Sequence, residues 1–307
     1  MWKRILSLCV AATLLLICPG CGRKSSNSSL SDLGGVYSSD EKAIDFRNEI
    51  SGKLTEGNDK RPGTKGRDKT ASTVAEGQYG DRLRSWGISR KPDNMTPDAD
   101  PGAPELLKKY GGIYIGDTTK KVIYLTFDEG YENGYTPKIL DVLRDNDVKA
   151  VFFITGPYLK EHQDLVRRMV EENQEVGNHT IRHPSLPSLG DRELEEEVLG
   201  LDRAFFEKFG RHMKYLRPPK GEYSERTLSV TQKLGYRNVF WSFAYDDWYR
   251  DRQRGADYAY NIVMRNLHNG AVLLLHAVSK DNADALDSII KGAREKGYEI
   301  GNINDIG

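Results

Sequence analysis

Strand-like and helix-like segments alternate without interruption from residue 122 to residue 303 of this 307-residue chain. Short aliphatic and aromatic runs, typical of buried parallel strands, are each followed by a segment whose apolar residues recur every three or four positions. The expected strands are 122–127, 150–154, 175–178, 215–217, 238–243, 271–275 and 298–303, and the expected helices are 137–146, 165–172, 191–209, 224–234, 256–267 and 283–296. This alternation predicts an α/β fold in which parallel strands with outer helices close, or nearly close, into a barrel.

Polar residues suited to a hydrolytic metal site follow four of the expected strands. In chain order they are Asp128 with Glu129, His179 with His183, Arg217, and His276. The carboxyl ends of parallel strands share one rim of a β/α barrel, and this rim is where such barrels carry out chemistry. If these were unrelated surface residues, their shared position at strand ends would require several coincidences.

The pair His179 and His183 has the spacing that, in a helical turn, brings two imidazoles to one face. Such a pair alone is weak evidence of a site, but a carboxylate from another strand end would complete a facial metal triad. Either Glu129 or Asp128 can be that third ligand. A divalent ion there would lower the pKa of its bound water to about 7, and the remaining carboxylate would act as the base.

Arg217 and His276 each allow a structural and a functional interpretation. Arg217 either forms a structural salt bridge or holds a catalytic carboxylate ionised and oriented. His276 is either a hydrogen-bonded rim residue or the acid that protonates a leaving amine. The nearby Asp247 could be the carboxylate partner of His276, and Trp248 could form an aromatic wall for a substrate or simply pack at the rim.

The motifs taken together resemble the NodB-homology polysaccharide deacetylases, also called carbohydrate esterase family 4. The matching fragments, in order, are residues 126–130 (TFDEG), 179–183 (HTIRH), 217–219 (RPP), 247–248 (DW) and 273–276 (LLLH). The resemblance extends from about Trp86 to the C-terminus. It implies a distorted (β/α) barrel and hydrolysis of the acetyl amide of N-acetylated sugars in chitin-like or peptidoglycan polymers.

The resemblance also implies a role for each matched residue. Asp128 would be the general base, Arg217 would fix it, Asp247 would orient the acid His276, and the Lys220 backbone N–H would bind the oxyanion, a donor whose loss typically costs about 3 kcal/mol. His179, His183 and Glu129 would hold a divalent metal, expected to be zinc, with cobalt, manganese and magnesium as alternatives. Glu129 stands where the family usually has aspartate, and its extra methylene moves the carboxylate outward.

Further fragments resemble the δ-lactam-biosynthetic de-N-acetylases of spore-forming bacteria. They are Trp86-Gly87, residues 106–111, residues 130–136 and residues 217–224. This branch implies deacetylation of N-acetylmuramic acid in glycan from which an upstream amidase has removed the peptide, leading to the muramic δ-lactam of spore cortex. Tyr131 and Trp248 are the expected substrate-binding residues. The alternatives are a deacetylase of peptidoglycan N-acetylglucosamine or chitooligosaccharides, and a non-catalytic glycan-binding module.

The N-terminal part has the features of an export segment followed by a tether. A basic start and an apolar run over residues 5–17, too short for the ~20 residues of a bilayer span, predict an export signal over residues 1–21. Gly20-Cys21 resembles a bacterial lipoprotein cleavage site, which implies attachment to the outer face of the cytoplasmic membrane. The alternatives are an ordinary cleaved signal peptide and an uncleaved anchor. Residues 22–80 are polar and predict a flexible tether with a reach on the order of 40 Å, and residues 81–307 form the expected catalytic domain.

Charge and cysteine content exclude two other classes of protein. The chain has 45 basic and 45 acidic residues and no basic stripe with interleaved aromatics, so nucleic-acid binding has no electrostatic basis. The three cysteines, at positions 9, 18 and 21, all lie within the export segment. The expected catalytic domain therefore contains neither a disulfide nor a thiolate metal ligand.

Overall fold

A curved parallel sheet forms the centre of the protein, seen in a computed structural model that describes residues 80–307. The predicted export signal, Cys21 and nearly all of the predicted tether lie outside the described residues. The main sheet has the strand order β10-β4-β5-β6-β7-β9, and β11 pairs with the beginning of β4. Its strands are β4 (Val122–Glu129), β5 (Val151–Ile154), β6 (Glu175–Asn178), β7 (Tyr215–Leu216), β9 (Arg237–Asn238), β10 (Val272–His276) and β11 (Glu299–Ile300).

The sheet closes into a distorted barrel through single bridges rather than through a full strand. Past β9, Val239 bridges Ile113, and Phe243 then bridges Leu273 of β10. The N–H groups of Ser242 and Phe243 both donate to the Val272 carbonyl. The predicted strand 238–243 is therefore interrupted, because this segment leaves one edge of the sheet and crosses to the other. The architecture otherwise agrees with the barrel expected from the sequence.

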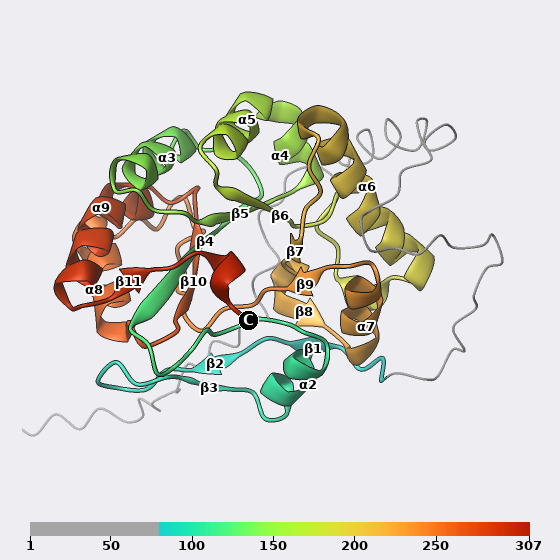
Figure 1. The fold of residues 1–307 in the computed structure, drawn as a ribbon, viewed down its shortest axis with the longest axis horizontal. Helices are drawn as coiled ribbons and strands as arrows, with labels where there is room; N and C mark the ends of the chain where they lie inside the picture. Colours follow the sequence, from blue (N-terminus) through green and yellow to red (C-terminus); the bar gives the residue numbers. More distant parts are fainter. Residues whose placement is uncertain (1–79) are drawn as a thin grey trace, which may run out of the picture.

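Helices cover the outside of this barrel (Figure 1). They are α3 (Thr136–Asp145), α4 (Gly156–Glu161), α5 (Gln163–Glu171), α6 (Asp191–Phe209), α7 (Glu225–Lys233), α8 (Ala256–Asn266) and α9 (Lys280–Glu295). α9 begins three residues before its predicted start, because the Ser279 side chain accepts a hydrogen bond from the Asn282 N–H and caps the helix. The short helix α4 was not predicted.

Side chains alternate between the two faces of β4, and this alternation divides its residues between two environments. Ile123, Leu125 and Phe127 belong to the large core between the sheet and the helices. Tyr124, on the opposite face, packs inside the barrel against residues of β5, β7 and β10. Successive strand residues point to opposite faces, so Asp128 points into the barrel and Glu129 toward the helices.

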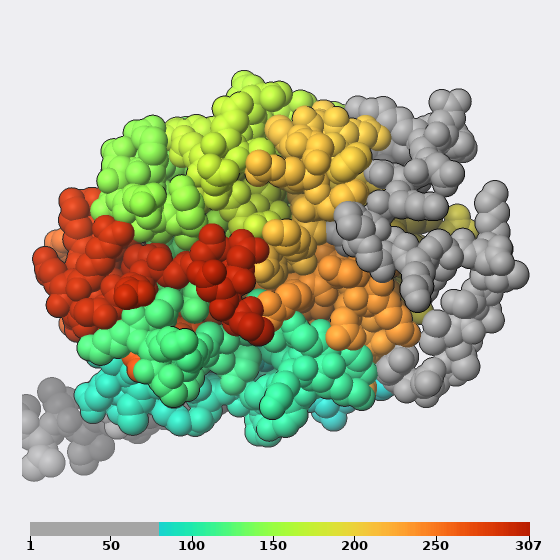
Figure 2. Space-filling view, viewed as in Figure 1, coloured from blue at the N-terminus to red at the C-terminus, as the bar shows by residue number. Residues whose placement is uncertain are grey.

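Segments from both ends of the described chain complete the barrel. β1 (Arg84–Ser85) pairs with β8 (Glu222–Tyr223), β2 (Ile88–Ser89) pairs with β3 (Asp98–Ala99), and α2 (Ala103–Lys109) follows. The C-terminal turn η4 (Ile303–Asp305) lies against the amino ends of the strands, where Asn304 hydrogen-bonds Tyr215 and Glu175. In the space-filling view this red C-terminal segment borders the segment around residues 110–120 (Figure 2). The amino-end opening of the barrel is therefore covered, and the carboxyl-end rim lies at the other end.

Within residues 80–307, no helix combines the length and the apolar composition needed to cross a bilayer.

Candidate active site

Strand register brings the predicted polar residues to one level of the barrel. His276, the last residue of β10, lies directly opposite Asp128 of β4. Along the other side, Glu129 is opposite Ile154, Ile154 is opposite Asn178, and Asn178 is opposite Leu216. His179 and Arg217 follow those last two residues in the chain. Side chains predicted from separate strand ends therefore meet at a single rim.

His179 and His183 converge, although not through the helical turn expected from their spacing. Residues 179–183 form an irregular loop in which Thr180 and His183 have left-handed backbone angles, with φ of 68° and 60°. Asn178 accepts a hydrogen bond from the Thr180 N–H at 2.8 Å, and the Thr180 hydroxyl accepts one from the His183 N–H at 3.0 Å. This loop sets the two Nε2 atoms 3.1 Å apart.

The hydrogen bonding of His179 decides which of its nitrogens is free to bind a cation. Its Nδ1 lies 2.8 Å from the Arg217 carbonyl oxygen, which can only accept, so Nδ1 carries the proton and Nε2 carries a lone pair. Burial lowers the pKa of His179, and burial together with the neighbouring His179 lowers the pKa of His183 well below its ordinary value. Both rings are therefore neutral at neutral pH, as metal ligands must be.

The two imidazoles fit one divalent cation. Two nitrogens bound to a single zinc ion at about 2.0–2.1 Å lie no more than about 4.2 Å apart, and the observed 3.1 Å is within that limit. The Asp128 Oδ2 lies 3.5 Å from the His179 Nε2. Among residues 80–307, however, no three His, Cys, Asp or Glu side chains are arranged as a complete ligand set.

Asp128 is held ionised by a buried arginine. The Arg217 Nη1 donates to Asp128 Oδ1 at 2.7 Å, and the other nitrogens of Arg217 are fixed by the Thr126 hydroxyl at 2.8 Å and the Val239 carbonyl at 3.1 Å. The guanidinium also lies over the Phe153 ring. Burial raises the pKa of Asp128, but Arg217 and the nearby imidazoles outweigh burial and lower the pKa below its usual value. Oδ2, which faces His179, is the oxygen left for chemistry.

Glu129, a predicted metal ligand, is not brought to the histidines. β4 continues through Glu129, so its side chain points to the helix side, where it is fully buried and its Oε1 accepts from the Thr136 hydroxyl at 3.4 Å. Burial, with the charge of Glu132 as the next cause, raises the pKa of Glu129 well above its ordinary value. The expectation that Glu129 coordinates the metal is therefore corrected: this carboxyl group belongs to the outer core.

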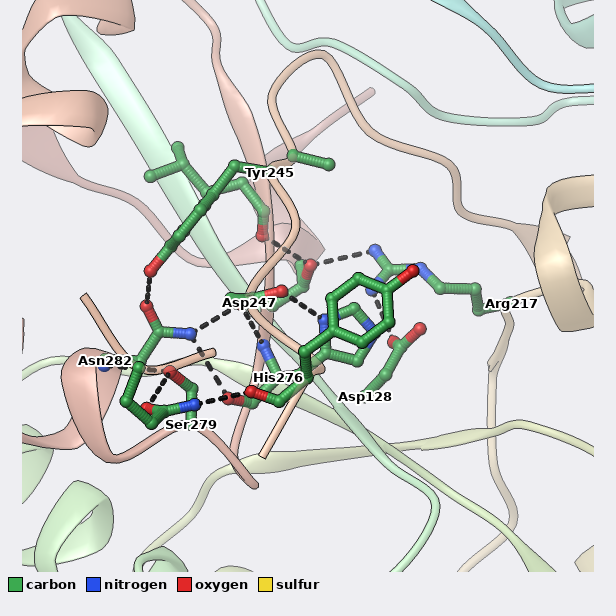
Figure 3. Close-up of polar contacts among 12 residues, drawn as sticks. Asp128, Arg217, Tyr245, Asp247, His276, Ser279 and Asn282 are labelled. Carbon is green, nitrogen blue, oxygen red and sulfur yellow. Dashed lines mark hydrogen bonds and ion pairs between the residues drawn. The ribbon is translucent and has the colours of Figure 1, made fainter. Parts of the chain in front are cut away.

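A chain of hydrogen bonds fixes the position of His276 (Figure 3). Asp247 Oδ1 accepts from His276 Nδ1 at 2.7 Å, and Asp247 Oδ2 accepts from the His276 N–H at 2.8 Å and from Asn282 Nδ2 at 2.5 Å. The Tyr245 hydroxyl in turn donates to Asn282. Burial lowers the pKa of His276, but Asp247 outweighs burial and raises it above the ordinary value. His276 therefore keeps its proton to higher pH than an ordinary histidine.

Tyr245 and Asn282 were not anticipated from the sequence. A signal for Asn282 does exist, because recognising Ser279 as the helix cap would have placed Asn282 in the first turn beside the strand end. Tyr245 had no comparable local signal. Its contact with Asn282 joins residues 37 positions apart.

An open cleft at the rim collects these residues. Its walls are formed by Asp128, His179, His183, Pro218, Lys220, Gly221, Trp241, Ala244, Trp248, Leu274 and His276. Trp248, one of these lining residues, packs edge-on against His276, with ring centroids 5.7 Å apart. Tyr131, the other predicted substrate contact, is not among the lining residues, and its ring lies beneath the Arg250 guanidinium at 5.1 Å.

Comparisons with known proteins agree on one family. The family described as "Polysaccharide deacetylase" matches residues 115–239. The chain is 42% identical to the Bacillus subtilis peptidoglycan-N-acetylmuramic acid deacetylase PdaA over 223 residues, which cover 72% of this chain and 85% of that relative. It is 31% identical to a Bacillus cereus peptidoglycan-N-acetylglucosamine deacetylase over 229 residues, covering 71% and 82%.

Solved structures extend the similarity to the fold. The structure of Bacillus subtilis PdaA, described as a family 4 carbohydrate esterase, matches with a TM-score of 0.72 at 41% identity, covering 74% of this chain and 97% of that one. A family 4 carbohydrate esterase from Bacillus anthracis matches with a TM-score of 0.63 at 44% identity, with the same coverage. The distorted barrel predicted from the sequence is confirmed by these matches.

Proposed function

The chain belongs to the polysaccharide deacetylase family, whose members hydrolyse carbon–nitrogen bonds, and we propose that it removes the acetyl group from N-acetylmuramic acid in peptidoglycan. One observation carries the proposed chemistry. Asp128 and His276 lie opposite each other on adjacent strands, and each is held by its own buried partner of opposite charge. The choice of sugar is supported by the 42% identity to PdaA.

The proposed reaction assigns a proton transfer to each of these two residues. Asp128 accepts a proton from the attacking water at Oδ2, since Oδ1 is occupied by Arg217. The Lys220 backbone N–H donates to the oxygen that becomes negatively charged as the acetyl carbonyl is attacked. His276 gives its Nε2 proton to the departing sugar nitrogen, since Nδ1 is bonded to Asp247. The products are acetate and a free amine on the sugar.

His179 and His183 would hold a divalent ion, with zinc as the first candidate and cobalt, manganese or magnesium as alternatives. Such an ion supplies Lewis acidity that lowers the pKa of water and polarises a carbonyl. The support for this proposal is the convergence of two neutral Nε2 atoms within reach of the Asp128 carboxylate.

The product points to a place in a sequence of reactions. A muramic δ-lactam forms when the freed amine meets the lactyl carboxylate of the same sugar, so deacetylation has to come first. The carboxylate is available only after the peptide has been removed. We therefore place this enzyme after an amidase and before lactam closure in spore cortex.

Peptide-free glycan strands provide the direct test. The purified protein should release acetate and convert muramoyl residues to the free amine, observed as a loss of 42 mass units per site, about the mass of the acetyl group less the hydrogen gained. Asp128→Asn should reduce the rate about 10²- to 10⁴-fold, the range for loss of a general base. Asp145→Asn, at an exposed position on α3, is the matched control.

The same product analysis distinguishes the proposed function from two others. Loss of the acetyl mass from N-acetylglucosamine rather than from N-acetylmuramic acid would assign the protein to the second sugar, which the Bacillus cereus relative is named for. A glycan-binding module would retain the strands and release no acetate. The buried Asp128–Arg217 pair argues against the latter, because glycan binding has no need of an ionised base within the cleft.

A further inference from the structure

Among the cleft-lining residues of the described part of the chain, Lys220 is the one lysine or arginine. It lies in the turn η3 (Pro219–Gly221) with a left-handed φ of 60°. The next residue, Gly221, has φ of 65°, and a Cβ there would come within 2.8 Å of the Trp241 ring. The Trp86 N–H donates to the Gly221 carbonyl at 2.8 Å. The position of Lys220 at the cleft wall is therefore fixed by its backbone and neighbours.

The ammonium group of Lys220 has no carboxylate partner among residues 80–307, whereas three arginines of the described chain each have one. Arg217 is paired with Asp128, Arg182 with Glu197, and Arg254 with Asp246. An unpaired cation close to the reacting centre suits a substrate that brings its own anion.

We propose that the Lys220 ammonium binds the lactyl carboxylate of the muramoyl residue being deacetylated. This inference rests on the proposed function, in which the backbone N–H of the same residue contacts the acetyl oxygen. The acetamido and lactyl groups are on adjacent carbons of the sugar ring. Lysine has a four-carbon stem, so its charge can reach the lactyl group while its backbone N–H contacts the acetyl oxygen.

This contact makes the enzyme selective for glycan from which the peptide has been removed. A lactyl group joined to peptide is a neutral amide and cannot form the ion pair, whereas the free acid can. The reaction that supplies the substrate must therefore be an amide hydrolysis that exposes the lactyl carboxylate. The ion pair with Lys220 is then the physical reason why amide hydrolysis precedes deacetylation.

The test compares kcat/KM for two soluble muramoyl glycans that differ only in the lactyl group, one as the free carboxylate and one as its methylamide. The wild-type enzyme should prefer the carboxylate about tenfold to hundredfold, the range for a charge-assisted hydrogen bond. Lys220→Met should bring this ratio to about 1–3, whereas Lys220→Arg, which keeps the charge, should retain most of it. Lys214→Met, at an exposed position in the approach to β7, should leave the ratio unchanged.

A second variant and a salt titration keep the test decisive if Lys220→Met fails to fold. Lys220→Asn suits a left-handed backbone better than methionine does and should also abolish the preference. In the wild-type enzyme the preference should fall as ionic strength rises, because an accessible ion pair is screened.

The failures of the two proposals differ. If the wild-type enzyme released acetate from neither muramoyl glycan, the proposed function would be wrong. If it released acetate but showed no preference for the carboxylate, or if the neutral variants kept the preference, only the role of Lys220 would be overturned.

Discussion

The charged partners of Asp128 and His276 determine which of these two groups is the base and which is the acid. Asp128 lies next to Arg217, and His276 lies next to Asp247, so each buried group has a neighbour of opposite charge. Arg217 lowers the pKa of Asp128 and Asp247 raises that of His276, in both cases against the effect of burial. The carboxyl group therefore stays ionised at neutral pH, and the imidazole keeps its proton to higher pH than an ordinary histidine, as suits a base and an acid.

This arrangement predicts a broad pH optimum. The rate should rise at low pH as Asp128 loses its proton, below the usual carboxyl range, and should fall only above pH 6.5, as His276 loses its proton. In Asp247→Asn the carboxylate that raises the pKa of His276 is gone while burial remains, so the alkaline fall should move to lower pH. Profiles of kcat/KM against pH would measure this shift. An alkaline limb at the same pH in both proteins would contradict the assignment of His276.

At the scale of single elements, the length of β4 decides the fate of its two acidic residues. The strand pairs with β5 up to Glu129, opposite Ile154. Alternation therefore continues to the last residue, which sends Asp128 into the cleft and Glu129 among the helices. A strand ending two residues earlier, as predicted from the sequence, would have left both carboxylates free to turn toward the metal.

The replacement Glu129→Gln tests this placement through stability. Because the folded pKa of Glu129 is raised, above pH 4.5 the unfolded chain releases a proton that the folded protein keeps, so the wild type loses stability as pH rises toward the folded value. Glutamine has no such proton. The stability of Glu129→Gln relative to wild type should therefore increase from pH 5 to pH 8, measured by thermal unfolding.

Zinc binding to the same variant, measured by titration calorimetry, tests whether Glu129 lies outside the metal site. Glu129→Gln should bind zinc within about twofold of wild type, since its side chain lies outside the cleft. His183→Ala should lose measurable zinc binding. A large loss of affinity in Glu129→Gln would return this residue to the metal site.

For the molecule as a whole, the barrel depends on segments far apart in the chain. The Trp86 indole donates to the Trp241 carbonyl at 2.9 Å, and β1 pairs with β8 directly after the turn that carries Lys220. The segment preceding the first barrel strand thus supports one wall of the cleft. A catalytic unit that began at Val122 would lack this support.

The proposed membrane attachment can be tested in intact cells. We propose that the protein is exported and held at the outer face of the cytoplasmic membrane by lipid on Cys21. Cys21→Ala should then move the protein from the membrane to the soluble fraction, because one residue carries the whole lipid anchor. The variant should keep its activity on soluble glycan. Retention in the membrane fraction would favour an uncleaved apolar anchor instead.

Local sequence patterns were sufficient to predict the class of fold and most of the polar residues of the cleft. The alternation of apolar runs and helical spacing predicted the barrel, and the strand ends identified Asp128, His179, His183, Arg217 and His276. These inferences succeed because hydrophobic periodicity and the position of a residue after a strand are properties of short segments. The shared level of the strand ends then follows from parallel pairing.

Other features depended on contacts between distant segments. The face taken by Glu129 follows from pairing with β5, and the support of Asp247 by Asn282 and Tyr245 follows from the packing of α9 against the barrel. The convergence of His179 and His183 comes from a loop with left-handed residues rather than from a helix. Periodicity carries no information on strand register or on side-chain partners across the barrel, because both are set by packing between elements that are remote in the chain.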